Sequence, residues 1–449
     1  MSAYASHINN LQDKTEVLAS EDIMSDQGVL LAKSGTTLNQ QTCQNILKFK
    51  LLKPLEDSIF IENQLTSKQI FQQIIDIVNR DFYLKSLNTK INKNGALQKC
   101  CKKLDEYPLL LQKLTVLDME LTDVFRQSLL SGYFACLCGV LENYKQDKVE
   151  ENFLAGITHD IGYLHIDRQI LLKQETLNAE EWKKVQSHPV IAYEILKRIP
   201  KFPKSSARAV LEHHENLDGS GYPRARTVHE LGGMGQLINL LDNVIVIYQK
   251  KFKPLKRSPN GVLPIIQINM HSYLPNVVST IFKLLKMIPP STAETSDEEI
   301  IRELIHYVQQ KQHYIKTITN AIQQANDTIG FTHQKKTLYA LQNTAINILV
   351  IMNSSGLGSD SIDWVEQLDR HEDQQALYSE VEDTRLMQGE LIFQLQSYQK
   401  SANVFINQYP DDSATQELKA ALDAFAKNAR PTEPDKLKEH WQQLAAKKA

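Results

Sequence analysis

Several features that would mark an extracellular, membrane-bound or nucleic-acid-binding protein are missing from this 449-residue chain. Its five cysteines are odd in number and form no Cys-x-x-Cys pair, so we expect reduced, buried thiols rather than a disulfide framework or a cysteine zinc site. Lysine and arginine (50) nearly balance aspartate and glutamate (53). Because no long basic run occurs, neither a nucleic-acid footprint nor a polybasic membrane anchor is predicted.

Long apolar runs are also lacking. No stretch approaches the roughly 18 apolar residues that a membrane-spanning helix needs, and the first ten residues lack the cationic and apolar parts of a signal peptide. We therefore expect a cytoplasmic protein. With 42% hydrophobic and 23% charged residues, the chain has an ordinary globular composition and is long enough for several domains.

The pattern of apolar residues, glycine and proline predicts a mainly α protein in four segments. Short β-prone runs beside glycine turns indicate a small α+β module over residues 1–65, followed by a helical connector over 66–109. A mostly helical central domain spans 110–288. Long amphipathic patterns predict an all-helical domain over 289–449, as an intramolecular bundle or, alternatively, as a surface that pairs with a second copy or a signalling partner. We expect the carboxylate-rich stretch 366–385 to be a solvated helix face.

The most informative run, residues 211–223, reads Leu-Glu-His-His-Glu-Asn-Leu-Asp-Gly-Ser-Gly-Tyr-Pro. Its imidazoles, His213 and His214, are metal-type ligands, and its carboxylates can bind a cation or accept hydrogen bonds behind a ligand. The Gly-Ser-Gly segment lets the backbone approach a bound group closely, and Pro223 fixes the chain direction. This combination predicts a metal-binding loop.

Other metal-type residues follow one another along the predicted helices. His159 and Asp160 are adjacent at the end of an apolar helix, where they can flank one ion or serve two. His188 precedes Pro189, which suits the first turn of a helix. Asp242 lies in an apolar run, where burying a carboxylate is costly unless it is paired or bound to a cation. Metal ligation is the simplest interpretation, and a helix cap or buried ion pair is the alternative.

Taken in order, these motifs resemble those of HD-GYP domains, a branch of the HD metal-dependent phosphohydrolases. The His-Asp pair stands here as His159-Asp160, and the Gly-Tyr-Pro motif as Gly221-Tyr222-Pro223. The resemblance implies a central all-helical HD-type domain with a centre of two or three divalent metals, often iron or manganese. It also implies hydrolysis of the bacterial second messenger cyclic di-GMP to pGpG or GMP.

Three positions depart from the family pattern. Gln127 stands where a helix usually carries a metal-binding histidine, so one metal site is predicted to be weak, with Asp123 one turn earlier as the compensating carboxylate. Tyr163 stands where a lysine usually faces the substrate phosphate; it can donate a hydrogen bond but carries no charge. The arginine that often follows at a distance in the family is missing after Asp242, and Lys250 or Lys251 is the candidate replacement.

The resemblance therefore implies three groups of site residues. The catalytic residues would be His159, Asp160 and Tyr163. The metal ligands would be His159, Asp160, His188, His213, His214 and Asp242, with Asp123 and Gln127 at the weaker position. The substrate would contact Lys173, Asp218, Gly219, Gly221, Tyr222, Pro223 and Lys251.

Three functions remain open at this point. The first is a metal-dependent cyclic di-GMP phosphodiesterase with reduced activity. The second is a catalytically inactive descendant that binds cyclic di-GMP or a protein partner and signals through its C-terminal helices. The third is a phosphohydrolase that acts on another nucleotide. Product formation separates the first from the second, and a panel of substrates separates the first from the third.

Overall fold

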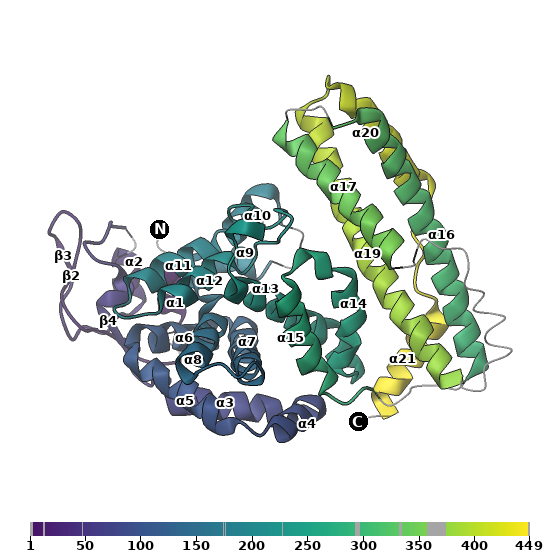
Figure 1. Cartoon of the computed structure of the whole chain (residues 1–449). Coiled ribbons are helices and arrows are strands. Elements are labelled where there is room, and N and C mark those ends of the chain that lie inside the picture. Colours follow the sequence, from purple (N-terminus) through teal and green to yellow (C-terminus); the bar gives the residue numbers. More distant parts are fainter. Residues whose placement is uncertain are drawn as a thin grey trace. The chain divides into compact units, whose positions relative to one another are not determined.

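The chain folds into two compact, mainly helical units in the computed structural model (Figure 1), which confirms the predicted fold class. The first unit comprises Met1–Val246 and Tyr273–Ile288, and the second comprises Ile247–Ser272 and Pro289–Ala449. The division into four segments stays a prediction. The structure describes residues 3–11, 14–46, 48–173, 175, 177–226, 228–291, 297–331, 335–355, 357 and 374–447.

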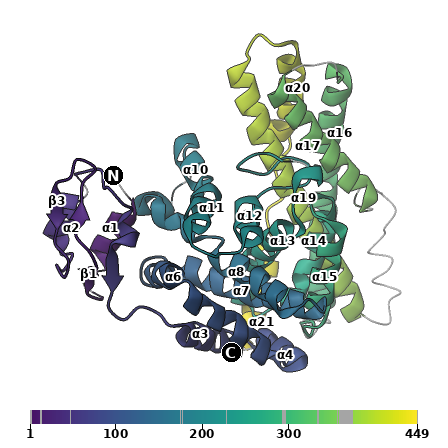
Figure 2. The ribbon, with the colours of Figure 1, turned by 60° about the vertical axis from the view of Figure 1, so that its left-hand side comes forward.

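The N-terminal part of the first unit contains short strands in two antiparallel pairs. Strand β1 (Val17–Ala19) pairs with β4 (Ile59–Ile61), and β2 (Ile23–Met24) pairs with β3 (Leu30–Ala32). The accompanying helices are α1 (Ala3–Asn10), α2 (Gln40–Ile46) and the short 3-10 helix η1 (Leu55–Asp57). Helix α1 lies on the side of this part that faces the helical core and packs against it (Figure 2).

The rest of the first unit is built from helices that surround the predicted metal ligands. They are α3 (Ser67–Asn79), α4 (Phe82–Ile91), α5 (Asn94–Lys102), η2 (Lys103–Glu106), α6 (Pro108–Glu120), α7 (Thr122–Leu141), α8 (Gln146–Thr158), η3 (Ile161–His165), α9 (Arg168–Leu171), α10 (Ala179–Val185), α11 (His188–Arg198), α12 (Lys204–Glu212), η4 (Val228–Glu230), α13 (Gly233–Ile247) and α15 (Pro275–Lys286). Helices α7 and α8 lie close together because Gly156 has no side chain. A Cβ atom there would lie 2.7 Å from the carbonyl oxygen of Ser131.

Helix α7 corrects one expectation from the sequence. By length and composition alone, its 20 residues could cross a membrane, but 72% of its most apolar stretch is buried inside the protein. Three residues with hydroxyl groups, Ser128, Ser131 and Tyr133, interrupt the apolar run in the sequence, yet all three are buried. Burial of this kind is typical of a core helix.

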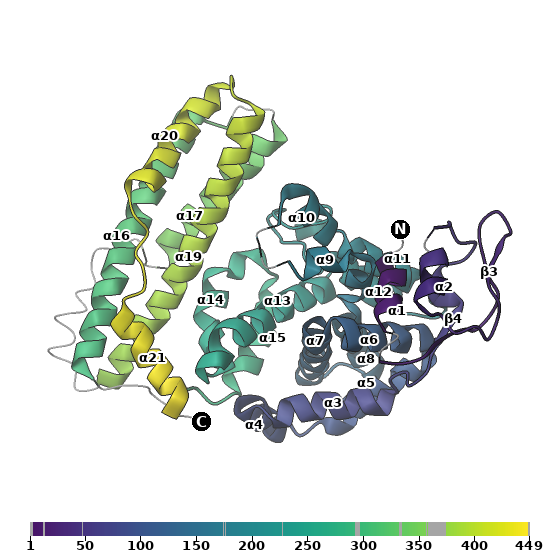
Figure 3. The same ribbon diagram turned by 180° about the vertical axis from the view of Figure 1, so that it is seen from behind.

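The second unit is dominated by long helices that run side by side (Figure 3). These are α16 (Glu298–Ile329), α17 (Lys336–Ser354), α19 (Gln374–Gln408), α20 (Ser413–Lys427) and α21 (Asp435–Lys447). The shorter elements are the π-helix η5 (Tyr248–Phe252), then η6 (Lys253–Leu255), η7 (Pro259–Val262), α14 (Leu263–Ile268) and η8 (Met270–Ser272). Apolar side chains such as Ile318 and Leu391 are fully buried between the long helices.

The carboxylate-rich stretch in this unit is not simply a solvated face. Residues 366–373 lie outside the described part of the chain, but Glu382 on α19 is only 2% exposed. Its carboxylate forms ion pairs with the guanidinium groups of Arg257 at 2.5 Å and Arg385 at 2.6 Å. The expectation is wrong at Glu382 because two cations compensate its burial. Arg385 follows three residues later on the same helix, but Arg257 is distant in sequence, so helical spacing does not reveal its contact.

Candidate metal centre

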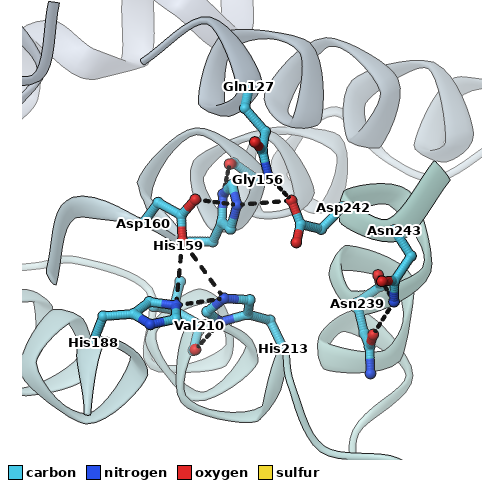
Figure 4. Close-up of polar contacts among 10 residues, drawn as sticks. All are labelled: Gln127, Gly156, His159, Asp160, His188, Val210, His213, Asn239, Asp242 and Asn243. Carbon is cyan, nitrogen blue, oxygen red and sulfur yellow. Dashed lines mark hydrogen bonds and ion pairs between the residues drawn. The ribbon is translucent and has the colours of Figure 1, made fainter. Parts of the chain in front are cut away.

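Three helix ends and one helix interior bring the predicted ligands together (Figure 4). His159 caps the C-terminus of α8, with Asp160 directly after it, and His213 caps the C-terminus of α12. His188 opens α11, as the following proline predicted, and Asp242 lies within α13. The three imidazoles of His159, His188 and His213 have no exposed surface, so the cluster sits inside the protein.

The Nδ1 atoms of these three histidines all contact a backbone carbonyl oxygen three residues earlier. The distances are 2.7 Å from His159 to Gly156, 2.8 Å from His188 to Val185 and 2.6 Å from His213 to Val210. Because a carbonyl oxygen only accepts, each Nδ1 carries the proton and donates it. The Nε2 atoms therefore face the centre of the cluster in the orientation that metal-binding histidines adopt.

Asp160 lies between the imidazoles, with its two carboxylate oxygens directed to different sides. Oδ1 lies 3.3 Å from Nε2 of His188 and 3.8 Å from Nε2 of His213. Oδ2 lies 3.1 Å from Nε2 of His159, whose Nε2 is also 3.4 Å from Oδ1 of Asp242. This is the arrangement of a carboxylate that bridges two positions.

The donor set fits divalent cations. Nε2 of His188 lies 3.2 Å from Nε2 of His213, and with both protons on Nδ1 two lone pairs face each other unless a cation lies beside them. Two groups of three ligand atoms each lie within 4.8 Å of one another: His188 with His213 and His214, and His159 with Asp160 and His213. Imidazole and carboxylate ligands suit transition metals such as iron and manganese.

Protonation differs between the two sides of the cluster. Burial and the neighbouring imidazoles hold the pKa of His213 well below its ordinary value, and burial lowers the pKa of His214 to about 4. Both are therefore neutral near pH 7, the form that binds metals. Burial also lowers the pKa of His159, but the carboxylates of Asp160 and Asp242 outweigh it and raise that pKa well above the ordinary value. A metal at His159 must displace a proton.

Gln127 and Asp123, the predicted residues on α7, behave differently. The Gln127 side chain donates a hydrogen bond from Nε2 to Oδ1 of Asp242 (Figure 4), so it joins the cluster. Asp123 has a fully exposed carboxylate, 3.9 Å from Arg126. Contrary to expectation, the structure leaves Asp123 outside the cluster, because it lies in the first turn of α7, where its side chain faces solvent.

Tyr163 lies against the cluster. Its ring stacks on His188 with centroids 4.1 Å apart. Gly162 makes this approach achievable, because a Cβ atom there would lie 2.1 Å from the carbonyl oxygen of His188. Burial, together with the charge of Asp160, raises the pKa of Tyr163 well above its ordinary value. The phenol thus remains a hydrogen-bond donor at neutral pH.

The glycine-rich loop folds back onto the histidine pair. The Tyr222 amide donates to the carbonyl oxygen of His214 at 3.0 Å, and the Tyr222 ring stacks on the His214 ring at 4.6 Å. A Cβ atom on Gly221 would lie 2.3 Å from that same oxygen, so only glycine fits. A cis peptide bond joins Tyr222 to Pro223, and Gly219 has a positive φ of 76°. The loop therefore places Tyr222 at the edge of the cluster.

Two predicted substrate residues have other contacts in the structure, and a third belongs to the second unit. Lys173 forms an ion pair with Glu181 at 2.8 Å. Asp218 accepts hydrogen bonds from the amide and hydroxyl groups of Ser220 at 2.9 and 2.6 Å. Lys251 is exposed on η5, in the second unit. Substrate contact by these three residues therefore stays a prediction.

Polar residues that support the loop were not singled out from the sequence. Gln236 and Asn239 on α13 donate to the carbonyl oxygen of Glu215 at 2.7 and 2.8 Å. Asn243 donates to Asn239 Oδ1 at 2.8 Å and to the Tyr273 hydroxyl at 3.0 Å. Their spacing of three and four residues on an otherwise apolar helix is the signal that would have found them.

Comparisons with known proteins agree with this geometry. Residues 105–271 match the family model described as HD domain. A cyclic di-GMP phosphodiesterase of Thermotoga maritima is 31% identical over 232 residues, which cover 49% of this chain and 61% of the relative. HD-domain phosphohydrolases are metal-dependent, and the ligand groups described above are consistent with that property.

Two further relatives extend the comparison. The 3'3'-cGAMP-specific phosphodiesterase 3 of Vibrio cholerae is 32% identical over 136 residues, covering 30% of this chain and 29% of the relative. The cyclic di-GMP phosphodiesterase PdeB of Borreliella burgdorferi is 24% identical over 218 residues, covering 48% and 55%. The chain thus spans at most 61% of these relatives' lengths. Residues 105–271 of this chain are therefore similar to HD domains, and the chain is also similar to relatives named as cyclic-dinucleotide phosphodiesterases.

Proposed function

We propose that the chain is a metal-dependent phosphodiesterase that hydrolyses cyclic di-GMP to pGpG or GMP in bacterial second-messenger signalling, in the cytoplasm. The observation that carries the proposal is the pair of Nε2 atoms of His188 and His213, 3.2 Å apart beside a carboxylate oxygen of Asp160. Relatives named for cyclic di-GMP hydrolysis support the choice of substrate.

Two ligand sets share Asp160 in this proposal. One metal would be held by Asp160, His188, His213 and His214. The other would be held by His159, Asp160 and Asp242, with Gln127 in place of a nitrogen ligand. When bound, divalent ions such as iron or manganese lower the pKa of water toward neutrality and offset the charge of the phosphodiester.

The protein's own groups orient and hold the reacting species. Backbone carbonyl oxygens behind His159, His188 and His213 fix the imidazole orientations. The imidazoles therefore need no reorientation, with its cost in free energy, during the reaction. The protonated phenol of Tyr163 offers a hydrogen bond to a phosphate oxygen. The Tyr222 ring, stacked on His214, limits the approach of water from the loop side.

The two metal positions are unequal in this proposal. The set with His188, His213 and His214 consists of two buried ligands and one half-buried ligand, His214, and the pKa values of His213 and His214 are lowered. At the other position, the Gln127 amide already bonds to Asp242, and His159 holds a proton more tightly than usual. We therefore expect one strong and one weak site, and reduced activity, because part of the charge compensation at the phosphodiester is lost.

The test is hydrolysis of cyclic di-GMP by the purified full chain loaded with Mn²⁺ or Fe²⁺, with chromatography of the products. Linear pGpG or GMP should appear, and the variant with His159→Ala and Asp160→Ala should form neither. Product formation at the same rate by this double variant would refute the proposal. A parallel assay with 3'3'-cGAMP, the substrate in the name of the Vibrio cholerae relative, shows which of the two cyclic dinucleotides the chain hydrolyses faster.

The alternative function is a catalytically inactive module that binds cyclic di-GMP or a partner. The specific observation in its favour is the hydrogen bond from Gln127 to Asp242, which occupies a ligand of the second metal position. Calorimetry on the full chain decides between them. Cyclic di-GMP binding without any product over a long incubation selects the inactive module.

A further inference from the structure

One buried carboxylate joins the N-terminal part of the first unit to the helical core. Glu56, in η1, is 4% exposed. Its Oε1 atom lies 3.3 Å from Nζ of Lys113 in α6, 3.7 Å from Nε2 of His165 and 3.5 Å from the Arg198 guanidinium. Groups from three separate elements of the core therefore meet on a single oxygen atom.

Two of those groups end the elements that begin at the metal cluster. Element η3 follows Asp160, carries Tyr163 and ends at His165. Helix α11 opens with His188 and ends at Arg198. The two elements also pack against each other. Glu56 thus contacts the far ends of both elements whose near ends supply cluster residues.

Tyr4 on α1 reinforces the same junction. Its ring stacks on His165 with centroids 5.3 Å apart and planes 9° apart, and Nζ of Lys113 lies 3.3 Å from the ring centroid. The Tyr4 hydroxyl donates to Gln112 Oε1 at 3.0 Å, and Gln112 Nε2 donates at 3.1 Å to the carbonyl oxygen of Glu56. Two N-terminal segments distant in sequence are therefore fixed at one point of the core.

The negative charge of Glu56 and the positive charges around it depend on one another at this junction. Lys113 has no exposed surface, and burial lowers its pKa to about 8 although Glu56 opposes the shift. Burial and the charge of Lys113 lower the pKa of His165 to about 3, so this imidazole is neutral near pH 7. Glu56 is therefore the anion that compensates Lys113 and, at the protein surface, Arg198. Burial raises the pKa of Glu56, but the charge of Lys113 and its hydrogen bond outweigh burial and hold that pKa below its ordinary value.

We propose that Glu56 is a positioning residue for the metal centre: by holding the ends of η3 and α11 together, the N-terminal part sets the placement of Asp160, Tyr163 and His188. A change in how this part docks would then change metal affinity without touching a ligand. The inference rests on the metal-binding part of the proposed function and goes beyond it, because it needs no particular substrate.

The test measures Mn²⁺ affinity of the full chain by calorimetry, alongside thermal unfolding without metal. Glu56→Gln alone would leave Lys113 as a buried, uncompensated cation, so the variant of choice is Glu56→Gln with Lys113→Met, which removes both charges at similar volume. We expect this double variant to unfold near the wild-type temperature but to bind Mn²⁺ about tenfold more weakly, as for loss of a group that orients ligands.

The matched control is the ion pair between Lys335 and Asp412 in the second unit, removed as Lys335→Met with Asp412→Asn. It should leave Mn²⁺ affinity unchanged whatever it does to unfolding. A second variant, Arg198→Met, removes one contact of Glu56 from a half-exposed side chain and buries no charge. It should weaken Mn²⁺ binding in the same direction.

The outcomes separate the two proposals. Wild-type Mn²⁺ affinity in a folded double variant, or in Arg198→Met if the double variant does not fold, overturns the positioning role and leaves the proposed function standing. A wild-type chain that binds no Mn²⁺ overturns both. Weaker binding in both junction variants, with wild-type binding in the control, supports the role of Glu56.

Discussion

The side-chain amide of Gln127 donates a hydrogen bond to the carboxylate of Asp242, whose Oδ1 atom also lies 3.4 Å from Nε2 of His159. Asp242 is thus shared between an amide donor and an imidazole. An amide N–H cannot coordinate a cation, and the amide oxygen is a poorer ligand for iron or manganese than imidazole nitrogen. The position around His159 and Asp242 therefore lacks a ligand that the position around His188 has.

The first prediction is that Gln127→His strengthens the weaker metal position. An imidazole supplies the missing nitrogen and removes the amide donor from Asp242. We expect metal content to rise from near one toward two ions per chain, and a gain of about 1.4 kcal/mol in binding would appear as a tenfold lower Kd. Elemental analysis and Mn²⁺ titration measure this. Gln127→Leu is the control, and equal metal content in both variants would contradict the prediction.

The second prediction concerns Glu215, which is 1% exposed and fixes the glycine-rich loop. Its carboxylate accepts hydrogen bonds from the backbone amides of Arg224 at 2.6 Å and Arg226 at 2.9 Å. Glu215→Gln removes the charge and one acceptor, so we expect the free energy of unfolding to fall by about 2 to 4 kcal/mol. Urea denaturation measures the loss.

Stability alone does not show that Glu215 orders the loop. Weaker stacking of Tyr222 on His214 should also appear as faster proteolysis within residues 216–226 of the folded variant. Glu180→Gln, at an exposed position on α10, serves as the control and should change stability by less than about 0.5 kcal/mol. An unfolding free energy equal to that of the control would refute the role assigned to Glu215.

The cluster was readable from the sequence because its members lie in short motifs at helix ends. Each motif can be recognised from neighbouring residues alone: His159 with Asp160, His188 before a proline, and the run around His213. The junction of Glu56 with Lys113 was not readable, because the two residues are 57 positions apart and each looks like an ordinary surface charge. Asp123 shows the opposite failure: helical spacing predicted a shared face, but the side chain is solvated.

The third prediction is a pH dependence of stability that originates at His165. Its pKa is about 3 in the folded chain, because of burial and the charge of Lys113, against an ordinary value of 6.5. Below pH 6.5 the unfolded chain binds a proton that the folded chain does not, so stability present above pH 6.5 is lost as pH falls toward 3. The loss is at most about 1.4 kcal/mol per pH unit.

His165→Gln isolates this contribution, since the other histidines are the same in both proteins. Between pH 7 and pH 5, with chelator present, the free energy of unfolding should fall by about 2 kcal/mol less in the variant than in the wild type. Urea titrations at several pH values give the two profiles. Parallel profiles would show that His165 becomes protonated in the folded chain without penalty.

The fourth prediction tests whether the Tyr163 hydroxyl contacts the substrate phosphate. Tyr163→Phe keeps the ring that stacks on His188 at 4.1 Å but removes the donor. If the hydroxyl stabilises the transition state, its loss costs about 1.4 kcal/mol or more, which lowers kcat/KM for cyclic di-GMP at least tenfold. The Mn²⁺ affinity of Tyr163→Phe should equal that of the wild type, because the phenol is not a metal ligand in the proposed site.

Tyr133→Phe is the matched control, because it removes a hydroxyl that donates a hydrogen bond to Asn88 Oδ1 at 3.2 Å, and it should keep wild-type kcat/KM. Equal activity of the two variants would show that phosphate is held by other groups and that the missing lysine has no substitute at Tyr163.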